Sequence, residues 1–325
     1  MGPCGFNTDS LSFTGSPLQQ AECLTRPVRE WGHLGPRRDA LPAALADRIA
    51  GTVPVPPRAA LTALINATGL AQRLAEDVAG EVSHARDGDG GAPMARYFVI
   101  HDTSGPRFGT FPPDLDGNVK INNLERFNCP DGSEIAHAFI NRHGAVFVGH
   151  DFGVPWRATK FERALGFGTS LKGLFLHVEL IQPRRRTRHG RDILAPTPGF
   201  SDPQYQFLAL LYTIASVRAG AWLIPAFHAV IDGDLRGGHD DPQNFDVDAF
   251  AQALDGVAAR LAAMDGNAAD GNPAANVWDR AAPGAAASAC RVCRVLNHGK
   301  EPRGHGGDNE ATGSGRKPDD HAAPD

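Results

Sequence analysis

Two strand-like segments of this sequence end on histidines, and a nearby loop adds another histidine and an aspartate. The segment YFVIHD reads as a buried strand that ends on His101, and LIPAFHAVI is a strand that runs into His228. The loop GGHDDPQNFD follows, with His239 and Asp241. A lone strand-end histidine is more often a hydrogen-bonded core residue. Two imidazoles and a carboxylate together, however, form a typical ligand set for a catalytic zinc ion.

A carboxylate in an apolar strand adds a second kind of chemistry. In LFLHVELIQ, the alternation of a strand places His177 and Glu179 on one face. Burying a carboxylate is unfavourable unless it is paired or functional. Glu179 would act as a general base that takes a proton from water and passes it to a leaving amine. The alternative is a structural ion pair with a nearby cation such as Arg184.

The elements that must position these residues form a mixed α/β domain over residues 94–264. Its pattern predicts strands at both histidine segments, a hairpin in AHAFINRHGAVFVGHDF, and amphipathic helices over 202–220 and 246–264. Residues 1–90 read as an N-terminal extension that is partly helical. Residues 265–325 are rich in Ala, Gly, Asp and Pro, and we expect a disordered tail there.

Composition excludes several classes of function. The net charge is −5 and the pI is about 6.2, so no basic field indicates a nucleic-acid partner. No apolar run approaches the roughly 20 residues of a transmembrane helix, and the first residues lack the features of a signal peptide. Five cysteines are too few for a disulfide scaffold. A Cys4–Cys23 bridge and free thiols are both compatible with the sequence, and no pattern indicates an oligomeric state.

Six short motifs occur in an order that resembles a known superfamily. VIHD, AHAFINRHGAVF, PWRATKFE, LHVELI, FHAVI and GGHDDPQNFD together resemble the zinc-dependent N-acetylmuramoyl-L-alanine amidases. That superfamily also includes amidase-type phage lysozymes and the peptidoglycan recognition proteins. The resemblance covers residues 94–262, about half of the chain, and no single motif is specific. It implies a central mixed β-sheet flanked by helices, with a zinc ion at one end of a groove.

The resemblance also implies roles for individual residues. His101, His228 and Asp241 match the zinc ligands, and Glu179 matches the family glutamate. His239 stands where the family often has a lysine that stabilises the oxyanion, so His239 is a second candidate catalytic residue. The loop that precedes Asp241 looks longer than in close relatives. An alternative therefore stays open, in which His239 is the third ligand and Asp241 does not bind the metal directly but lies next to a ligand.

Three further residues match the walls of the family groove. His137 stands at a hairpin position where a Tyr or His often lines the cleft, and Trp156 matches a tryptophan of the groove wall. His177 occupies a position that is usually small in the family, where it would touch substrate or only bond to Glu179. We expect all three to be substrate-binding residues.

The function implied is hydrolysis of the amide bond between N-acetylmuramic acid and L-alanine, in peptidoglycan or in soluble muropeptides. Such a substrate favours a periplasmic or secreted protein, although a cytoplasmic one is compatible with a muropeptide substrate. A non-catalytic protein of the same fold that recognises peptidoglycan is the alternative. Relatives of that kind commonly lose a zinc ligand, whereas all three candidates are present here. A third hypothesis is an adaptor role centred on the N-terminal helices and the tail.

Overall fold

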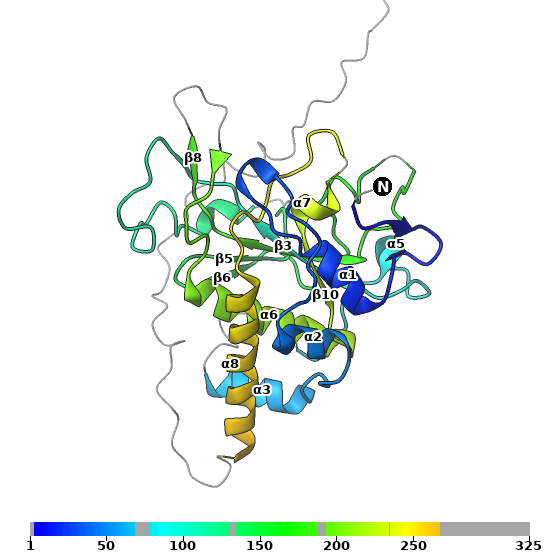
Figure 1. Ribbon diagram of the computed structural model, residues 1–325. Helices are drawn as coiled ribbons and strands as arrows, with labels where there is room; N and C mark the ends of the chain where they lie inside the picture. Colours follow the sequence, from blue (N-terminus) through cyan, green and yellow to red (C-terminus); the bar gives the residue numbers. More distant parts are fainter. Residues whose placement is uncertain are drawn as a thin grey trace, which may run out of the picture.

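The computed structural model describes residues 3–68, 78–129, 134–164, 166–186, 193–233 and 235–266. Within these residues a five-stranded mixed β-sheet lies at the centre, with helices packed against it (Figure 1). The predicted α/β class with a central mixed sheet is therefore confirmed. The predicted tail lies outside the described residues, apart from its first two positions. No helix of the described part has the length and apolar composition needed to span a bilayer.

The central sheet has the strand order β10-β3-β7-β5-β6. Its strands are β3 (Tyr97–Asp102), β5 (Ala138–Ile140), β6 (Val146–Val148), β7 (Phe175–Leu180) and β10 (Ile224–Phe227). The pairs β10–β3, β3–β7 and β7–β5 are parallel, and β5–β6 is the predicted antiparallel hairpin. Parallel strands end at one edge of a sheet, so the residues that end β3, β7 and β10 converge there.

The register of the sheet fixes which side chains meet at that edge. His101 on β3 lies opposite Glu179 on β7, and Phe227 at the end of β10 lies opposite Ile100. His228 follows directly and begins the short helix α7 (His228–Ile231). The neighbouring strands β3, β7 and β10 thus position His101, Glu179 and His228 at the same edge of the sheet.

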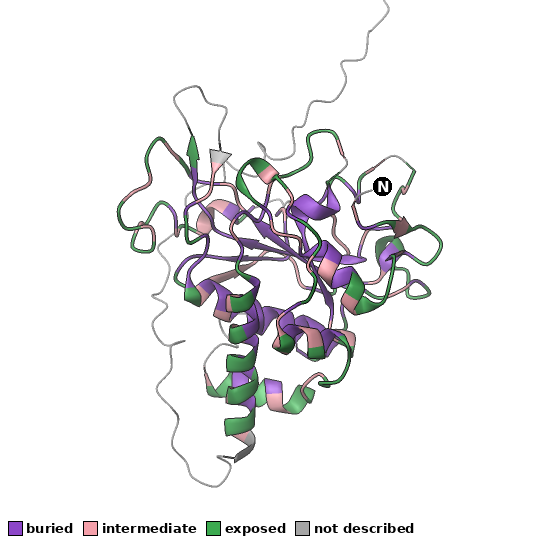
Figure 2. Ribbon diagram, in the orientation of Figure 1, coloured by how far each residue is buried: buried purple, intermediate pink, exposed green. Residues whose placement is uncertain are grey.

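Helix α6 (Asp202–Ala219) packs between the sheet and helix α8 (Val247–Gly266). Ser201 and Gln204 form a capping box at its start, and Gly220 ends it with a φ of 72°, a conformation that glycine adopts without strain. Most of its residues are buried. The outer side of α8 is exposed, whereas the four parallel strands β10, β3, β7 and β5 of the central sheet are buried throughout their length (Figure 2). The helices predicted over 202–220 and 246–264 are therefore confirmed, but only α8 has one buried and one exposed side, because α6 is covered on both sides.

The N-terminal residues share one apolar core with the sheet. The Phe13 ring packs edge-on against Tyr97 of β3, with 5.2 Å between ring centroids. The Phe13 N–H donates to the Tyr97 hydroxyl, which in turn donates to Gln20. Helices of this region also pack on α8. The boundary between residues 1–90 and 94–264 stays a sequence-based prediction. The side chains of the two segments pack together in one hydrophobic core.

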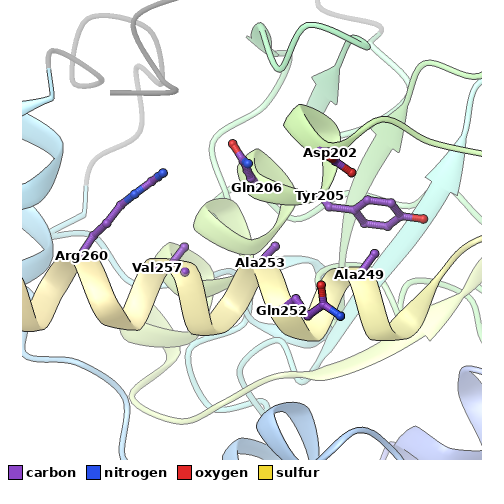
Figure 3. A pocket seen from close by; sticks show the side chains of 9 residues that line it. Asp202, Tyr205, Gln206, Ala249, Gln252, Ala253, Val257 and Arg260 are labelled. Carbon is purple, nitrogen blue, oxygen red and sulfur yellow. The ribbon is translucent and has the colours of Figure 1, made fainter. Parts of the chain in front are cut away.

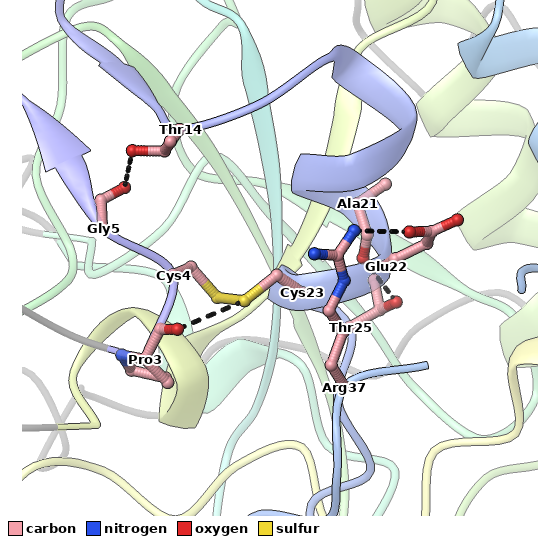
Figure 4. Close-up of a disulfide and its surroundings, with 9 residues drawn as sticks. All are labelled: Pro3, Cys4, Gly5, Thr14, Ala21, Glu22, Cys23, Thr25 and Arg37. Carbon is pink, nitrogen blue, oxygen red and sulfur yellow. Dashed lines mark hydrogen bonds and ion pairs between the residues drawn. A yellow bond between two sulfur atoms is a disulfide. The ribbon is translucent and has the colours of Figure 1, made fainter. Parts of the chain in front are cut away.

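A disulfide joins Cys4 to Cys23 near the start of the chain (Figure 4), as one of the two alternatives predicted. Cys23 belongs to α1 (Pro17–Leu24), whose start is capped by Ser16 and Gln19. The remaining elements are short or lie at the periphery: β1 (Phe6–Asn7), β2 (Ser12–Phe13), α1 (Pro17–Leu24), η1 (Glu30–Gly32), α2 (Ala43–Ile49), α3 (Arg58–Ala67), α5 (Ala85–Gly88), β4 (Arg107–Phe108), η2 (Glu125–Phe127), β8 (Arg184–Arg186) and β9 (Ile193–Leu194).

Candidate metal centre

His101, His228 and Asp241 form a buried group at the carboxyl edge of the sheet that could hold a metal ion. The two Nδ1 atoms of His101 and His228 are 2.8 Å apart. Asp241 Oδ2 lies 3.7 Å from the first and 3.2 Å from the second. Ligand atoms of a tetrahedral zinc site, each about 2.0–2.2 Å from the metal, lie about 3.3–3.6 Å apart. The observed triangle fits such a site with only small adjustments.

The outer ring nitrogens of both histidines face other polar side chains. His228 Nε2 lies 3.1 Å from Asp232 Oδ2, and His101 Nε2 lies 3.1 Å from His177 Nδ1. Metal-binding histidines usually turn their second ring nitrogen to such a partner, which fixes the tautomer. With the Nε2 protons turned outward, both Nδ1 atoms present lone pairs to the same point. Two lone pairs and a carboxylate facing each other require a cation between them.

The charges around the group affect the pKa values of its three members differently. Burial opposes a charge on this ring, but the carboxylates of Asp241 and Asp232 outweigh it and raise the pKa of His228 well above its usual value. Burial, reinforced by His228, lowers the pKa of His101 well below its usual value. Burial also opposes the charge on Asp241, but His228 holds its pKa well below the usual range. These directions favour an ionised Asp241 beside a neutral His101, whereas a metal ion that binds here would displace a proton from His228.

The Asp241 carboxylate is held in place by the end of β3. The backbone N–H of Asp102 donates to Asp241 Oδ2 at 3.1 Å, and the Asp241 carbonyl accepts the N–H of Ala229 at 2.8 Å. Asp102 is in turn paired with Arg184, whose Nη2 lies 2.6 Å from Asp102 Oδ2. Arg184, which the sequence offered as a partner for Glu179, is thus committed to Asp102, and both side chains are fully buried.

We expect Arg184→Met to lower the free energy of unfolding by about 3–5 kcal/mol, because Asp102 is left as a buried charge without its partner. Urea denaturation of the purified protein measures the change. Arg185→Met is the matched control: Arg185 is an exposed neighbour on β8, so its loss should change stability by no more than about 0.5 kcal/mol. Equal effects of the two substitutions would contradict the structural role given to the Asp102–Arg184 pair.

Glu179 lies beside the metal group, on the neighbouring strand. Its Oε1 is 3.9 Å from His101 Nδ1. Its Oε2 is buried and has no hydrogen-bond partner among the described residues. Burial, followed by the nearby Asp241 and Asp102 carboxylates, raises the pKa of Glu179 well above its usual value. A buried carboxyl oxygen without a protein partner is available to a water molecule or to a substrate.

A cavity of about 490 Å³ opens over this group. Glu179, His228 and Asp241 contribute to its lining, together with backbone and side chains from the loops that follow β3 and β10. Three cationic side chains also line it: Arg107, Lys160 and Arg163. A second pocket of about 270 Å³ lies between α6 and α8 (Figure 3), and none of the predicted site residues lines it.

His239 lies at the rim of the cavity and not in its depth. Its side chain is 46% exposed, its Nδ1 is 3.6 Å from Asp241 Oδ1, and its ring is 4.1 Å from the ring of His228. His239 also forms a second possible metal-binding group with His228 and Asp232. The alternative in which His239 is a ligand is therefore compatible with the geometry, but only Asp241 accompanies both predicted histidine ligands.

The three predicted substrate-binding residues lie outside the cavity lining. His137 is fully buried, with Nε2 bonded to the Val154 carbonyl and Nδ1 accepting the backbone N–H of His177. Trp156 is half-buried and packs on His150 at 4.1 Å between ring centroids. His177 is fully buried behind His101. Contact of these residues with a substrate stays a sequence-based prediction that the cavity does not support.

Two buried carboxylates, one beside the metal group and one behind His177, were not expected from the sequence. Asp232 lies four residues after His228, and this i, i+4 spacing on a helical turn is a signal that could have identified it. Glu162 in the motif TKFE carries no such signal, because its partner His177 is on a distant strand. Comparisons of this chain with protein families, with curated proteins and with solved structures found no match.

Proposed function

We propose that this protein is a zinc-dependent amidase that hydrolyses the bond between N-acetylmuramic acid and L-alanine in peptidoglycan or muropeptides. The observation that carries the proposal is the buried group of His101, His228 and Asp241 beside the unpartnered carboxyl oxygen of Glu179. The order of the six sequence motifs supports this choice of substrate.

Zinc suits the group because two imidazoles and one carboxylate match its preference for nitrogen and oxygen ligands in a site with an open position. When bound there, zinc would supply Lewis-acid chemistry, polarising a carbonyl group and making water more acidic. His101 and His228 would offer their Nδ1 atoms, and Asp241 a carboxylate oxygen.

Glu179 is the proton carrier of the reaction. In its ionised form Glu179 would receive a proton from the attacking water at Oε2 and deliver it to the nitrogen of L-alanine as the amide bond breaks, and its raised pKa makes that form the stronger base. His239, at the rim, donates an N–H to the oxyanion that develops on the lactyl carbonyl. The cavity lining contains carboxylates as well as the cations Arg107, Lys160 and Arg163, and these cations could pair with free carboxylates of a peptide stem.

We expect Asp241→Ala to lose bound zinc, whereas His239→Ala keeps it and loses a smaller part of its turnover. The reason is that Asp241 lies close to both imidazole ligands, while His239 is half-exposed at the rim. Metal content after dialysis, measured for both variants, checks the prediction. Zinc lost from His239→Ala and retained by Asp241→Ala would make His239 the third ligand and contradict our assignment.

A disulfide and the proposed substrate together support a location outside the cytoplasm. The Cys4–Cys23 disulfide is of the kind that persists in oxidising compartments, where peptidoglycan is also found. We include this location in the proposal.

The test is digestion of purified peptidoglycan by the zinc-loaded protein, followed by labelling of new amino groups. Release of N-terminal L-alanine that stops after chelation and resumes with added zinc is the expected result. Binding to peptidoglycan without any release would favour the non-catalytic recognition protein. Release that is insensitive to the chelator would contradict the zinc-dependent mechanism.

A further inference from the structure

A chain of three buried side chains leads away from the metal group into the protein. His101 Nε2 lies 3.1 Å from His177 Nδ1, and His177 Nε2 lies 3.2 Å from Glu162 Oε2. His177 and Glu162 are completely buried, and His101 is 1% exposed. Neither His177 nor Glu162 lines the cavity, so neither is placed to contact a substrate.

The hydrogen bonds of Glu162 indicate which atoms donate and which accept along this series of three side chains. Its Oε2 accepts the backbone N–H groups of Ala158 and Thr159 and the Thr159 hydroxyl, at 2.9–3.1 Å. An oxygen that accepts three donors is an unprotonated acceptor. His177 Nε2 lies 3.2 Å from this carboxylate oxygen, although the pair is not aligned as a hydrogen bond, and it has no other hydrogen-bond partner among the described residues. Its proton is therefore stabilised at Nε2, facing Glu162.

The proton positions of the two histidines follow from that orientation. A neutral imidazole has one donor and one acceptor nitrogen. If His177 carries its proton on Nε2, its Nδ1 is an acceptor, and His101 must donate its own Nε2–H to it. His101 Nδ1 then has no hydrogen and points toward His228 and Asp241.

We propose that Glu162 and His177 are positioning residues that hold His101 in the tautomer able to bind a metal through Nδ1. The inference rests on the metal site of the proposed function and adds two residues that do not touch it. Strand β7 contributes two residues to the site. Glu179 faces the cavity, and His177, two residues earlier on the same face, accepts the Nε2–H of His101 and so keeps its proton on Nε2. A purely space-filling role would be met by an apolar side chain and would need no buried carboxylate.

The first test is the zinc affinity of His177→Phe, measured by competition with a chromophoric chelator. The substitution keeps an aromatic ring but removes the acceptor for His101 Nε2–H, so we expect zinc binding to weaken by about 10–100-fold. His177→Asn, which offers an amide oxygen at the position of Nδ1, should recover most of the affinity.

Tyr97→Phe is the matched control, because it removes a buried hydroxyl and its two hydrogen bonds from the same strand as His101 but far from the metal group. It should lower stability without weakening zinc binding. If His177→Phe and Tyr97→Phe bind zinc as tightly as the wild type, the proposal is overturned while the metal site stands. If the wild type itself binds no zinc, the proposed function fails.

The second test observes the proton directly, in metal-free protein with ¹⁵N-labelled histidine. Two-bond proton–nitrogen correlations distinguish the two neutral tautomers, and His101→Asn assigns the signal by its loss. We expect the Nε2–H form of His101 in the wild type and a shift toward the Nδ1–H form in His177→Phe. An Nδ1–H form in the wild type would overturn the proposal whatever the zinc affinities are.

Discussion

His228→Ala is expected to purify with little zinc, below about a tenth of the wild-type content, and to show no measurable amidase activity. Two remaining ligands cannot hold a catalytic zinc tightly. The loss also leaves Asp232 and Asp241, both buried carboxylates, without the imidazole that each of them faces. Metal content of the dialysed protein and release of L-alanine amino groups are the two measurements.

His143→Ala is the matched control for this variant. His143 is an exposed histidine in the turn of the β5–β6 hairpin, whereas the proposed ligands are buried. Its replacement should leave zinc content and activity unchanged. A His228→Ala protein that is active and metal-free would refute the assignment of the metal centre as a whole.

Glu179→Gln is expected to keep its zinc and to lose turnover by about 100-fold or more, because a glutamine has the shape of glutamate but cannot carry the proton. The neutral amide also removes a carboxyl group from a pocket that already holds Asp241 and Asp102, so zinc content should not fall for lack of stability. Turnover and zinc content are measured on the same preparation. Retention of more than about a tenth of the wild-type turnover would mean that another group moves the proton.

The positions of the principal site residues could be predicted because they depend on periodicity and strand order. Alternation along β7 places His177 and Glu179 on one face, and the parallel pairing with β3 then sets Glu179 opposite His101. The apolar runs before His101 and His228 mark the strands whose ends meet. These signals are local in the sequence. The parallel pairing of β10, β3 and β7 brings the residues that carry them to one edge of the sheet.

The environment of the buried polar groups could not be predicted in the same way. The partner of Arg184 is Asp102 and that of His177 is Glu162, and neither pair lies within one helix or strand, where periodicity would indicate it. His137 has the residue type expected of a cleft wall, but both of its ring nitrogens are engaged by backbone groups in the interior. Residue type and spacing indicate which side chains can do chemistry, whereas burial and partners decide which of them face the cavity.

The central claim is that the protein cleaves one particular amide bond. Digestion of a defined muropeptide in water enriched in heavy oxygen, with the products identified by mass, tests it most directly. We expect one heavy oxygen in the lactyl carboxylate of N-acetylmuramic acid, and a peptide with an unlabelled, free L-alanine amino group. Heavy oxygen at a sugar reducing end or at a carboxylate within the peptide would show cleavage of another bond and contradict the account.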